Sequence, residues 1–466
     1  MKVHLIAACG VGMSALAGLL RAAGHDVTGS DEHVYPPAST LLEELGIPVH
    51  SGWDPARLEG VDLVVCGNAV RRTNPEAEAA ERRGLRMTSM PGALEEMFLA
   101  GRTPLVVAGT HGKTTSAAML AWVLARTGRD PGFLVGGVPR ELGRSFALGS
   151  GRWFVIEGDE YDSAYFDKGP KFLHYRPEVL LLTAVEFDHA DIYRDLDHVK
   201  DAFRKLIAIL PPDATVAACG DFPHVADVIA GVRGTVHRFG VGPENEWRIT
   251  DLTDDGTTRF TVRQKDRAIC RVTLQIPGAI NARNAVGVLL TAAEAGVGFE
   301  EGAAALAAFR GVRRRQEEVG TVGGITVIDD FAHHPTAVAG TLAALRLRYP
   351  GRRLRAVFEP RSNTSRRRVF QEEFVAALGA ADDVVLAAVF TKPGDPIPPA
   401  ERLAPETIAE ALSGRGTPAR TIDGVPAIRD YLVGSGQAGD VIVIMSNGAF
   451  GGLPKLVVDS LAAAAA

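Results

Sequence analysis

The sequence has few cysteines, no long apolar run and no excess of positive charge, and each absence excludes a class of protein. Among 466 residues there are four cysteines, and no two of them form a Cys-x-x-Cys pair. A disulfide framework or a structural zinc site needs more cysteines at closer spacing. We therefore expect reduced thiols and a cytoplasmic location. The four residues are Cys9, Cys66, Cys219 and Cys270.

The lack of a long apolar run and the negative net charge argue against two kinds of partner, membranes and nucleic acids. No apolar stretch approaches the ~20 residues that a membrane-spanning helix requires, so no membrane partner is expected. Met1 and Lys2 lead directly into the strand-like residues 3–8, which leaves no room for a signal peptide. The formal net charge is −6, whereas nucleic-acid binders usually carry a basic excess, so nucleic acid is not an expected partner.

Length and pattern predict several α/β domains. A chain of 466 residues exceeds one ordinary core, and 46% hydrophobic residues with 23% charged residues are typical of a globular protein. Short apolar runs alternate with helical patterns, which favours parallel sheets covered by helices. Breaks at 102–104 and 313–315 divide the chain into three consecutive α/β domains, at 1–101, 102–315 and 316–466. The pattern between about 235 and 276 predicts a small antiparallel patch.

The strongest motif is a glycine turn between an apolar strand and a helix-forming stretch. Backbone N–H groups of such a loop point inward and the helix N-terminus adds partial positive charge, so the loop binds phosphates. Lys113 is expected to reach the β- and γ-phosphates, and the Thr114 hydroxyl to bind Mg²⁺. The spacing is shorter than in the common pattern, and a chance glycine turn is the alternative. The loop comprises Gly109, Thr110, His111, Gly112, Lys113, Thr114 and Thr115.

Two acidic segments follow predicted buried strands. Carboxylates at residues 157–162 come after the strand 153–156, where α/β proteins bind ligands, and hard oxygen ligands suit Mg²⁺. Glu157 lies nearest the strand end and is the expected metal ligand, with a solvated acidic turn as the alternative. After the strand 179–182, three acids surround His189 at 186–191. We expect His189 or its neighbours to bind a second Mg²⁺.

A glycine loop also follows the first predicted strand. Gly10 and Gly12 with Ala15 fit the G-x-G-x-x-A pattern of dinucleotide sites, and Ser30-Asp31 ends the next strand. The loop supports NAD binding, recognition of another nucleotide diphosphate, or a bare packing turn. A nicotinamide-dependent oxidoreductase would rest on these residues alone and would explain nothing after residue 101. A non-catalytic nucleotide-binding regulator would have no need of paired metal ligands.

Three segments of the last domain place polar groups after predicted strands. They are residues 329–335, 359–364 and 445–452. Together they predict the wall of a cleft, although each could be an ordinary loop. Arg361 is the natural partner for a carboxylate or phosphate because a guanidinium binds such groups in a bidentate manner.

These motifs together resemble the Mur ligase family, along essentially the whole chain. The resemblance rests on 109–115, 157–162, 187–191 and 330–335. It implies a Rossmann-like N-terminal domain for the UDP-sugar, a P-loop ATPase domain and a Rossmann-like C-terminal domain for the amino acid or peptide. Segment 359–364 is more similar to the branch that joins L-alanyl-γ-D-glutamyl-meso-diaminopimelate to UDP-N-acetylmuramic acid than to the L-alanine-adding branch, which stays the alternative.

The resemblance also implies roles for single residues, with ATP and Mg²⁺ as cofactors. Lys113, Glu157 and His189 would be catalytic, and Thr114, Glu157 and His189 would hold metal. The sugar nucleotide, a murein tripeptide and a monomer or weak homo-oligomer are expected. ATP or domain closure would involve Asn281, Asn284, Arg315, Asp330 and His333; the substrates would meet Gly10, Gly12, Ser30, Asp31, Asn68, Arg361, Ser446 and Asn447.

The chain departs from the family pattern at two places. Ile280 precedes Asn281 where the family usually has a histidine, so a contact near the adenine would be missing. The N-terminal loop begins with Ala8-Cys9 rather than with further glycines, so it offers fewer glycines for the expected diphosphate contact. Some family members carry a carbamylated lysine near the metals, and the sequence assigns that part to no lysine here.

Overall fold

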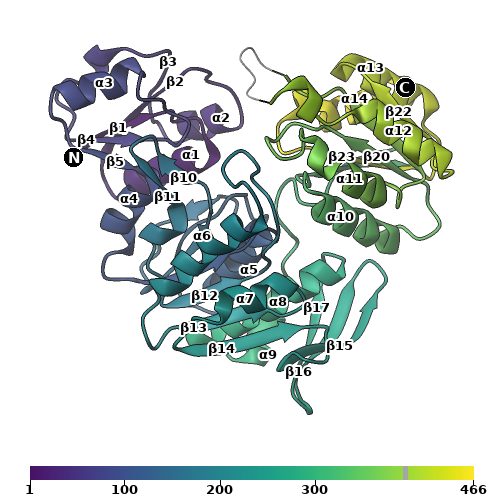
Figure 1. The fold of residues 1–466 in the computed structure, drawn as a ribbon, viewed down its shortest axis with the longest axis horizontal. Helices are drawn as coiled ribbons and strands as arrows, with labels where there is room; N and C mark the ends of the chain where they lie inside the picture. The colour runs from purple at the N-terminus through teal and green to yellow at the C-terminus, as the bar shows by residue number, and fades with distance from the viewer. Residues whose placement is uncertain (392–396, 466) are drawn as a thin grey trace.

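A computed structural model describes residues 1–391 and 397–465. In Figure 1 the N-terminal and C-terminal domains lie on opposite sides above the central domain. Each domain has its own sheet, of five, ten and six strands in chain order, and a two-stranded hairpin lies between the first two domains. The prediction of three consecutive α/β domains is confirmed. Within the described residues, no helix is both long and apolar enough to cross a membrane.

The N-terminal domain is a parallel sheet in the order β3-β2-β1-β4-β5. Its first strand leads into a helix that packs on the central domain, where Gly18 leaves room for the ring of Phe146 and a Cβ would collide with it. The elements are β1 (Lys2–Ile6), α1 (Val11–Ala22), β2 (Asp26–Asp31), α2 (Ala38–Glu44), β3 (Val49–Ser51), β4 (Leu63–Cys66), α3 (Pro75–Arg82), β5 (Met87–Ser89) and α4 (Met90–Leu94).

The central domain has the largest sheet, in the order β17-β16-β15-β14-β13-β12-β6-β9-β7-β8. Its elements are β6 (Thr103–Ala108), α5 (Lys113–Arg126), β7 (Gly132–Leu134), β8 (Phe146–Ala147), β9 (Trp153–Gly158), β10 (Asp162–Ala164), β11 (Asp167–Pro170), η3 (Lys171–His174), β12 (Val179–Leu182), α6 (Leu196–Ala208), β13 (Thr215–Cys219), α7 (Pro223–Ile229), β14 (Thr235–Gly240), β15 (Trp247–Asp254), β16 (Thr258–Gln264), β17 (Arg267–Leu274), α8 (Ala279–Glu294) and α9 (Phe299–Leu306).

The antiparallel patch is smaller than the sequence predicted. Strands β15, β16 and β17 pair antiparallel, whereas β14 runs parallel to both of its neighbours. The expected patch therefore begins at Trp247 rather than near residue 235. The buried central strands β6, β9 and β12 run parallel side by side, so their carboxyl ends reach one edge of the sheet.

The C-terminal domain has the strand order β18-β19-β23-β20-β21-β22, and only the pairing of β18 with β19 is antiparallel among the described strands. Apolar side chains are buried on both faces of this sheet. The elements are β18 (Glu317–Val322), β19 (Ile325–Asp330), α10 (Pro335–Arg348), β20 (Leu354–Phe358), α11 (Gln371–Leu378), β21 (Asp383–Ala387), α12 (Pro405–Gly414), β22 (Ala419–Ile422), α13 (Val425–Ser435), β23 (Val441–Met445) and α14 (Leu453–Ala465).

Candidate active site

A cavity of about 470 Å³ lies where the three domains meet. The N-terminal domain contributes Val11, Gly12 and Met90 to its wall. The central domain contributes the loop after β6 and the acidic segments at the carboxyl ends of β9 and β12. The C-terminal domain contributes Asn447 and the residues that follow β19. Predicted strand-end motifs of all three domains therefore contribute to one space, but segment 359–364 with Arg361 does not line it.

The loop between β6 and α5 has the backbone of a phosphate-binding turn. Gly109 and Gly112 have φ of +130° and +82°, a region that favours glycine. A Cβ at Gly109 would collide with Thr183, and one at Gly112 would lie 2.6 Å from Asn284 Oδ1. The remaining residues of the loop, Thr110 to Thr115, line the cavity. Helix α5 begins at Lys113, so its free N–H groups face that space.

Lys113 is held by the loop carbonyl and by an acid. Its ammonium donates to Gly109 O at 2.7 Å and to Glu160 Oε2 at 2.8 Å. Burial disfavours the charged ammonium, but the carboxylates of Glu160 and Asp159 outweigh this effect and raise the pKa of Lys113. The lysine therefore stays charged inside a buried site, as binding of phosphate requires.

Glu157 lies at the end of β9, as the sequence predicted, and touches the phosphate loop. Its carboxylate accepts a hydrogen bond from Thr114 Oγ1 at 3.1 Å and another from Gly136 N–H. Burial raises the pKa of Glu157 despite the Gly136 N–H and the charge of Lys113. Hydroxyl and carboxyl oxygens suit Mg²⁺, and a buried carboxylate with too little positive charge nearby would gain from a cation. Thr114 and Glu157 therefore fit a magnesium site.

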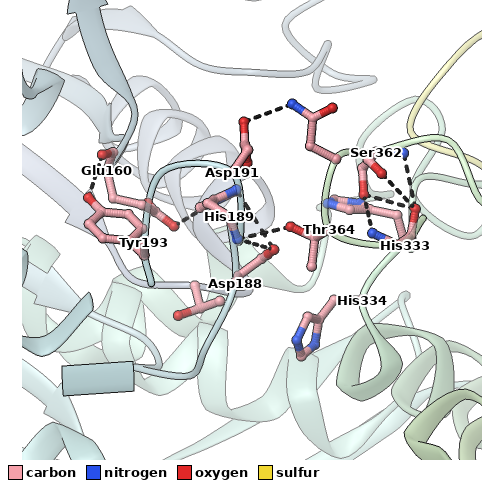
Figure 2. A network of polar contacts seen from close by, with 12 residues as sticks. Glu160, Asp188, His189, Asp191, Tyr193, His333, His334, Ser362 and Thr364 are labelled. Atoms are coloured by element: carbon pink, nitrogen blue, oxygen red, sulfur yellow. Dashed lines mark hydrogen bonds and ion pairs between the residues drawn. The ribbon is translucent and has the colours of Figure 1, made fainter. Parts of the chain in front are cut away.

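His189 contacts Glu160, whereas the metal prediction named it together with Glu157. Its Nε2 donates to Glu160 Oε1 at 2.9 Å, as Figure 2 shows. Burial opposes its charge, but Asp188 and then Glu160 raise the pKa of His189 to about 9. Ligand atoms of Asp159, Glu160 and His189 lie within 4.8 Å of one another. Glu160 thus joins Lys113 to His189, a role that sequence reasoning missed although the acidic run 157–162 contained it.

The loop that carries His189 is fixed by the C-terminal domain. The backbone N–H of His189 donates to Asp188 Oδ1 at 2.6 Å and to Thr364 Oγ1 at 2.9 Å. Asn363 Nδ2 donates to Asp191 Oδ2 at 2.7 Å. Figure 2 shows the two loops facing each other across these bonds. The position of His189 therefore depends on where the C-terminal domain sits.

His111 points toward a second polar cluster at the back of the phosphate loop. Its Nε2 lies 2.7 Å from Glu186 Oε2, and its ring centroid lies 4.5 Å from that of His334. The side-chain hydroxyl of Thr110 donates to Glu186 O at 3.2 Å. The side chains of these two loop residues thus brace the turn, while both residues still line the cavity.

The junction between the central and C-terminal domains reaches into the phosphate site through Arg315. Its guanidinium donates to Thr114 Oγ1 at 3.3 Å and lies 4.7 Å from the centre of the Phe331 ring. Asp330 accepts hydrogen bonds from Gln316 N and Ala332 N, both at 2.7 Å. Asp330 therefore holds together the two segments that bring Arg315 and its aromatic partner to the cavity.

His333 and the two predicted asparagines lie in the cavity wall. Burial lowers the pKa of His333. Asn281 Nδ2 donates to Pro277 O at 2.7 Å, and Asn284 Nδ2 lies 3.4 Å from Asn281 Oδ1. Ile280 stands in the same wall and presents an apolar surface where the family pattern has an imidazole.

The predicted sugar-nucleotide residues are divided between the cavity and the domain interior. Gly12 lines the cavity and Asn68 is exposed. Asp31 accepts hydrogen bonds from the N–H groups of Cys9, at 2.8 Å, and His33, at 3.1 Å, and so shapes the exposed loop that holds Gly10. The prediction for Ser30 does not agree with its position, because Ser30 is fully buried and donates its hydroxyl to Glu76.

The predicted peptide residues meet at the carboxyl ends of β20 and β23. The Arg361 guanidinium lies 4.5 Å from the centre of the Phe390 ring and its Nη1 is 3.7 Å from Glu359 Oε1. Ser446 donates its hydroxyl to Glu359. Asn447 lines the cavity, and its Oδ1 is buried without a hydrogen-bond partner among the described residues. This carbonyl oxygen remains available to a ligand N–H group.

Three family models match the chain in succession. They are described as the Mur ligase family catalytic domain at residues 2–102, the Mur ligase middle domain at 107–292 and the Mur ligase glutamate ligase domain at 314–448. The chain belongs to the Mur ligase family. The matches to this Mur ligase extend over the region that a nicotinamide-dependent oxidoreductase left unexplained.

Relatives of this Mur ligase cover almost its whole length. The UDP-N-acetylmuramate--L-alanyl-gamma-D-glutamyl-meso-2,6-diaminoheptandioate ligase of Escherichia coli is 40% identical over 464 residues, 99% of this chain and 98% of that protein. The UDP-N-acetylmuramate--L-alanine ligase of Symbiobacterium thermophilum is 38% identical over 96% of this chain and 92% of that protein. The crystal structure of a murein peptide ligase from Psychrobacter arcticus covers 99% of this chain and 98% of its own at 36% identity, with a TM-score of 0.75.

Proposed function

We propose that this ligase uses ATP to join L-alanyl-γ-D-glutamyl-meso-diaminopimelate to UDP-N-acetylmuramic acid, in recycling of peptidoglycan. The observation that carries the proposal is a cavity to which all three domains contribute, with Lys113 and buried acids between the N-terminal and C-terminal walls. Two substrates held by the outer domains would meet there at the phosphates. The likeness to the E. coli and P. arcticus peptide ligases supports the choice of substrates.

The chemistry is activation of a carboxylate. The lactyl carboxylate of the sugar nucleotide attacks the γ-phosphorus of ATP, ADP leaves, and an acyl phosphate forms. The peptide amine then attacks the acyl carbon and loses a proton. Phosphate departs, and the product is an amide. Carboxylate and phosphate repel each other, so the site must neutralise charge and align the groups.

The residues of this chain supply that neutralisation. Lys113 is buried and charged beside the phosphate loop, and Arg315 reaches Thr114 from the junction with the C-terminal domain. Bound Mg²⁺ would add positive charge at the phosphates. Thr114 with Glu157 would hold one ion, and His189 with its acidic neighbours a second.

The peptide would bind at the C-terminal wall. Arg361 offers a guanidinium for a peptide carboxylate, and Asn447 offers a buried carbonyl oxygen that accepts no hydrogen bond from the described residues. Ser446 positions Glu359 beside Arg361. A reducing, cytoplasmic site of action suits the four free cysteines, and a monomer or weak homo-oligomer is part of the same proposal.

The L-alanine-adding reaction is the second candidate, because the S. thermophilum relative with that name is 38% identical to this chain. Phosphate release from ATP with Mg²⁺ and UDP-N-acetylmuramic acid separates the two. We expect release with the diaminopimelate tripeptide and background release with L-alanine. A Lys113→Met variant, which keeps the side-chain length but lacks the ammonium, is the matched control and should be silent.

Either of two results would contradict the proposal. Phosphate release with L-alanine alone would support the same carboxylate activation but assign the enzyme to de novo synthesis of peptidoglycan. No release with either amine, from protein that binds ATP, would leave the phosphate loop as a binding site without this reaction.

A further inference from the structure

Lys171 is a cavity residue to which the reaction described above assigns no part. It begins η3, directly after the hairpin of β10 and β11, and its side chain is 14% exposed. Its backbone N–H donates to Tyr161 O at 3.0 Å, and the next residue, Phe172, donates to Asp159 O at 3.3 Å. The lysine is therefore fixed over the acidic segment that follows β9, and it is one of the residues that line the cavity.

The ammonium of Lys171 has capacity for a ligand. Among the described residues it donates one hydrogen bond, to Asp159 Oδ2 at 2.8 Å. An ammonium has three N–H donors, so two are left. Lys113 donates to Glu160, the residue directly after Asp159, at 2.8 Å. The two lysines thus pair with adjacent carboxylates, Lys171 with Asp159 and Lys113 with Glu160.

The segment that carries Lys171 is attached to the N-terminal domain. Tyr165, in the turn of the hairpin, donates its hydroxyl to Glu81 at 2.7 Å. At the other end of the segment, His174 lies 3.2 Å from Glu95 and 2.6 Å from Asp167. Figure 1 shows the hairpin between the two domains. Lys171 therefore belongs to the side of the cavity that the N-terminal domain forms.

We propose that Lys171 binds the lactyl carboxylate of the sugar nucleotide and holds it next to the phosphates of ATP; this assignment rests on the proposed function. The carboxylate enters from the N-terminal side and must approach polyanionic phosphates. Lys113 is placed for the phosphates, and Arg315 reaches Thr114 from the junction of the central and C-terminal domains. Lys171 offers the attacking carboxylate a separate positive charge on the N-terminal side of the cavity, where the sugar nucleotide enters.

The competing explanation is that Lys171 only balances the charge of Asp159. A charge-balancing lysine would affect folding or all ligands alike, whereas a carboxylate-binding lysine affects one functional group of one ligand. UDP-N-acetylglucosamine separates the two explanations, because it has the same nucleotide and a similar sugar without the lactyl carboxylate.

The test is calorimetric binding of UDP-N-acetylmuramic acid and UDP-N-acetylglucosamine to the full chain, without ATP. We expect Lys171→Met to weaken binding of the first ligand roughly 10- to 100-fold, the size of one charge-assisted hydrogen bond, and to leave the second unchanged. Lys171→Arg should restore part of the loss. Lys168→Met is the matched control, because Lys168 is 68% exposed on the same hairpin and pairs with Asp162 at 3.1 Å.

If Lys171→Met does not fold, the double variant Asp159→Asn, Lys171→Met removes both charges and is compared with Asp159→Asn alone. Equal weakening of both nucleotides would overturn the assignment in favour of a diphosphate contact. Unchanged binding of both would reduce Lys171 to a partner of Asp159. If the wild-type chain bound neither nucleotide, the proposed function itself would be refuted. The Lys171 variants alone do not test that function.

Discussion

His334 joins the central and C-terminal domains as a neutral imidazole, and this predicts a loss of local stability in acid. Its Nδ1 accepts a hydrogen bond from Thr336 N at 3.3 Å and caps α10, while Nε2 donates to Phe187 O at 3.1 Å. Both bonds require the tautomer with hydrogen on Nε2. Burial, and then the nearby His111, lower the pKa of His334 to about 4.

The sign and the size of the effect follow from proton linkage. The unfolded or opened chain has a histidine pKa of about 6.5, so it takes up a proton more readily than the closed state. Stability is therefore complete above about pH 6.5 and is lost as the pH falls toward 4. With 1.36 kcal/mol per pKa unit, the loss at His334 reaches about 3 kcal/mol below pH 4 and about 2 kcal/mol at pH 5.

Amide hydrogen exchange in α10, corrected for the intrinsic rate at each pH, measures this loss locally. Between pH 7 and pH 5 the protection of the wild-type chain should fall roughly thirtyfold, which corresponds to about 2 kcal/mol. His334→Asn is the matched control, because asparagine keeps a helix-capping oxygen and cannot titrate. If wild type and variant showed parallel profiles, His334 would not be a buried neutral histidine in solution.

Two further predictions concern the metal and peptide residues. Glu157→Ala should abolish phosphate release at every Mg²⁺ concentration, because it removes the carboxylate that meets Thr114; near-normal turnover would exclude Glu157 from the metal site. Arg361→Ala should raise the KM for the diaminopimelate peptide roughly tenfold or more and leave the KM for ATP unchanged, since one charged hydrogen bond is lost; an unaltered peptide KM would contradict the peptide role.

Long buried strands were predictable from the sequence, and short polar ones were not. The predicted strands 153–156 and 179–182 lie in β9 and β12, because a central parallel strand is buried on both faces. The edge strand β3 and the hairpin of β10 and β11 carry polar residues over three or four positions, so they give no periodic signal. Their positions depend on tertiary packing.

The candidate site shows the same division between local and long-range information. The turn before α5 consists of consecutive residues, so its glycines and their left-handed conformations could be predicted from the local sequence. The bonds that Glu160 makes with Lys113 and His189 join three separate segments, and no local spacing predicts them. Ser30 shows the converse error, because a polar residue at a strand end was expected at the ligand and is instead buried against Glu76.

The loop after β20 connects Arg361, the proposed peptide residue, to the loop that carries His189. Arg361 and Thr364 lie three residues apart in this loop, and Thr364 Oγ1 accepts the backbone N–H of His189. The same loop is attached to Asp191 through Asn363. A peptide bound at Arg361, as proposed, would therefore also fix the hydrogen-bond partners of the His189 loop. Placement of His189 would then depend on the position of the loop after β20, because Thr364 and Asn363 supply its contacts from the C-terminal domain.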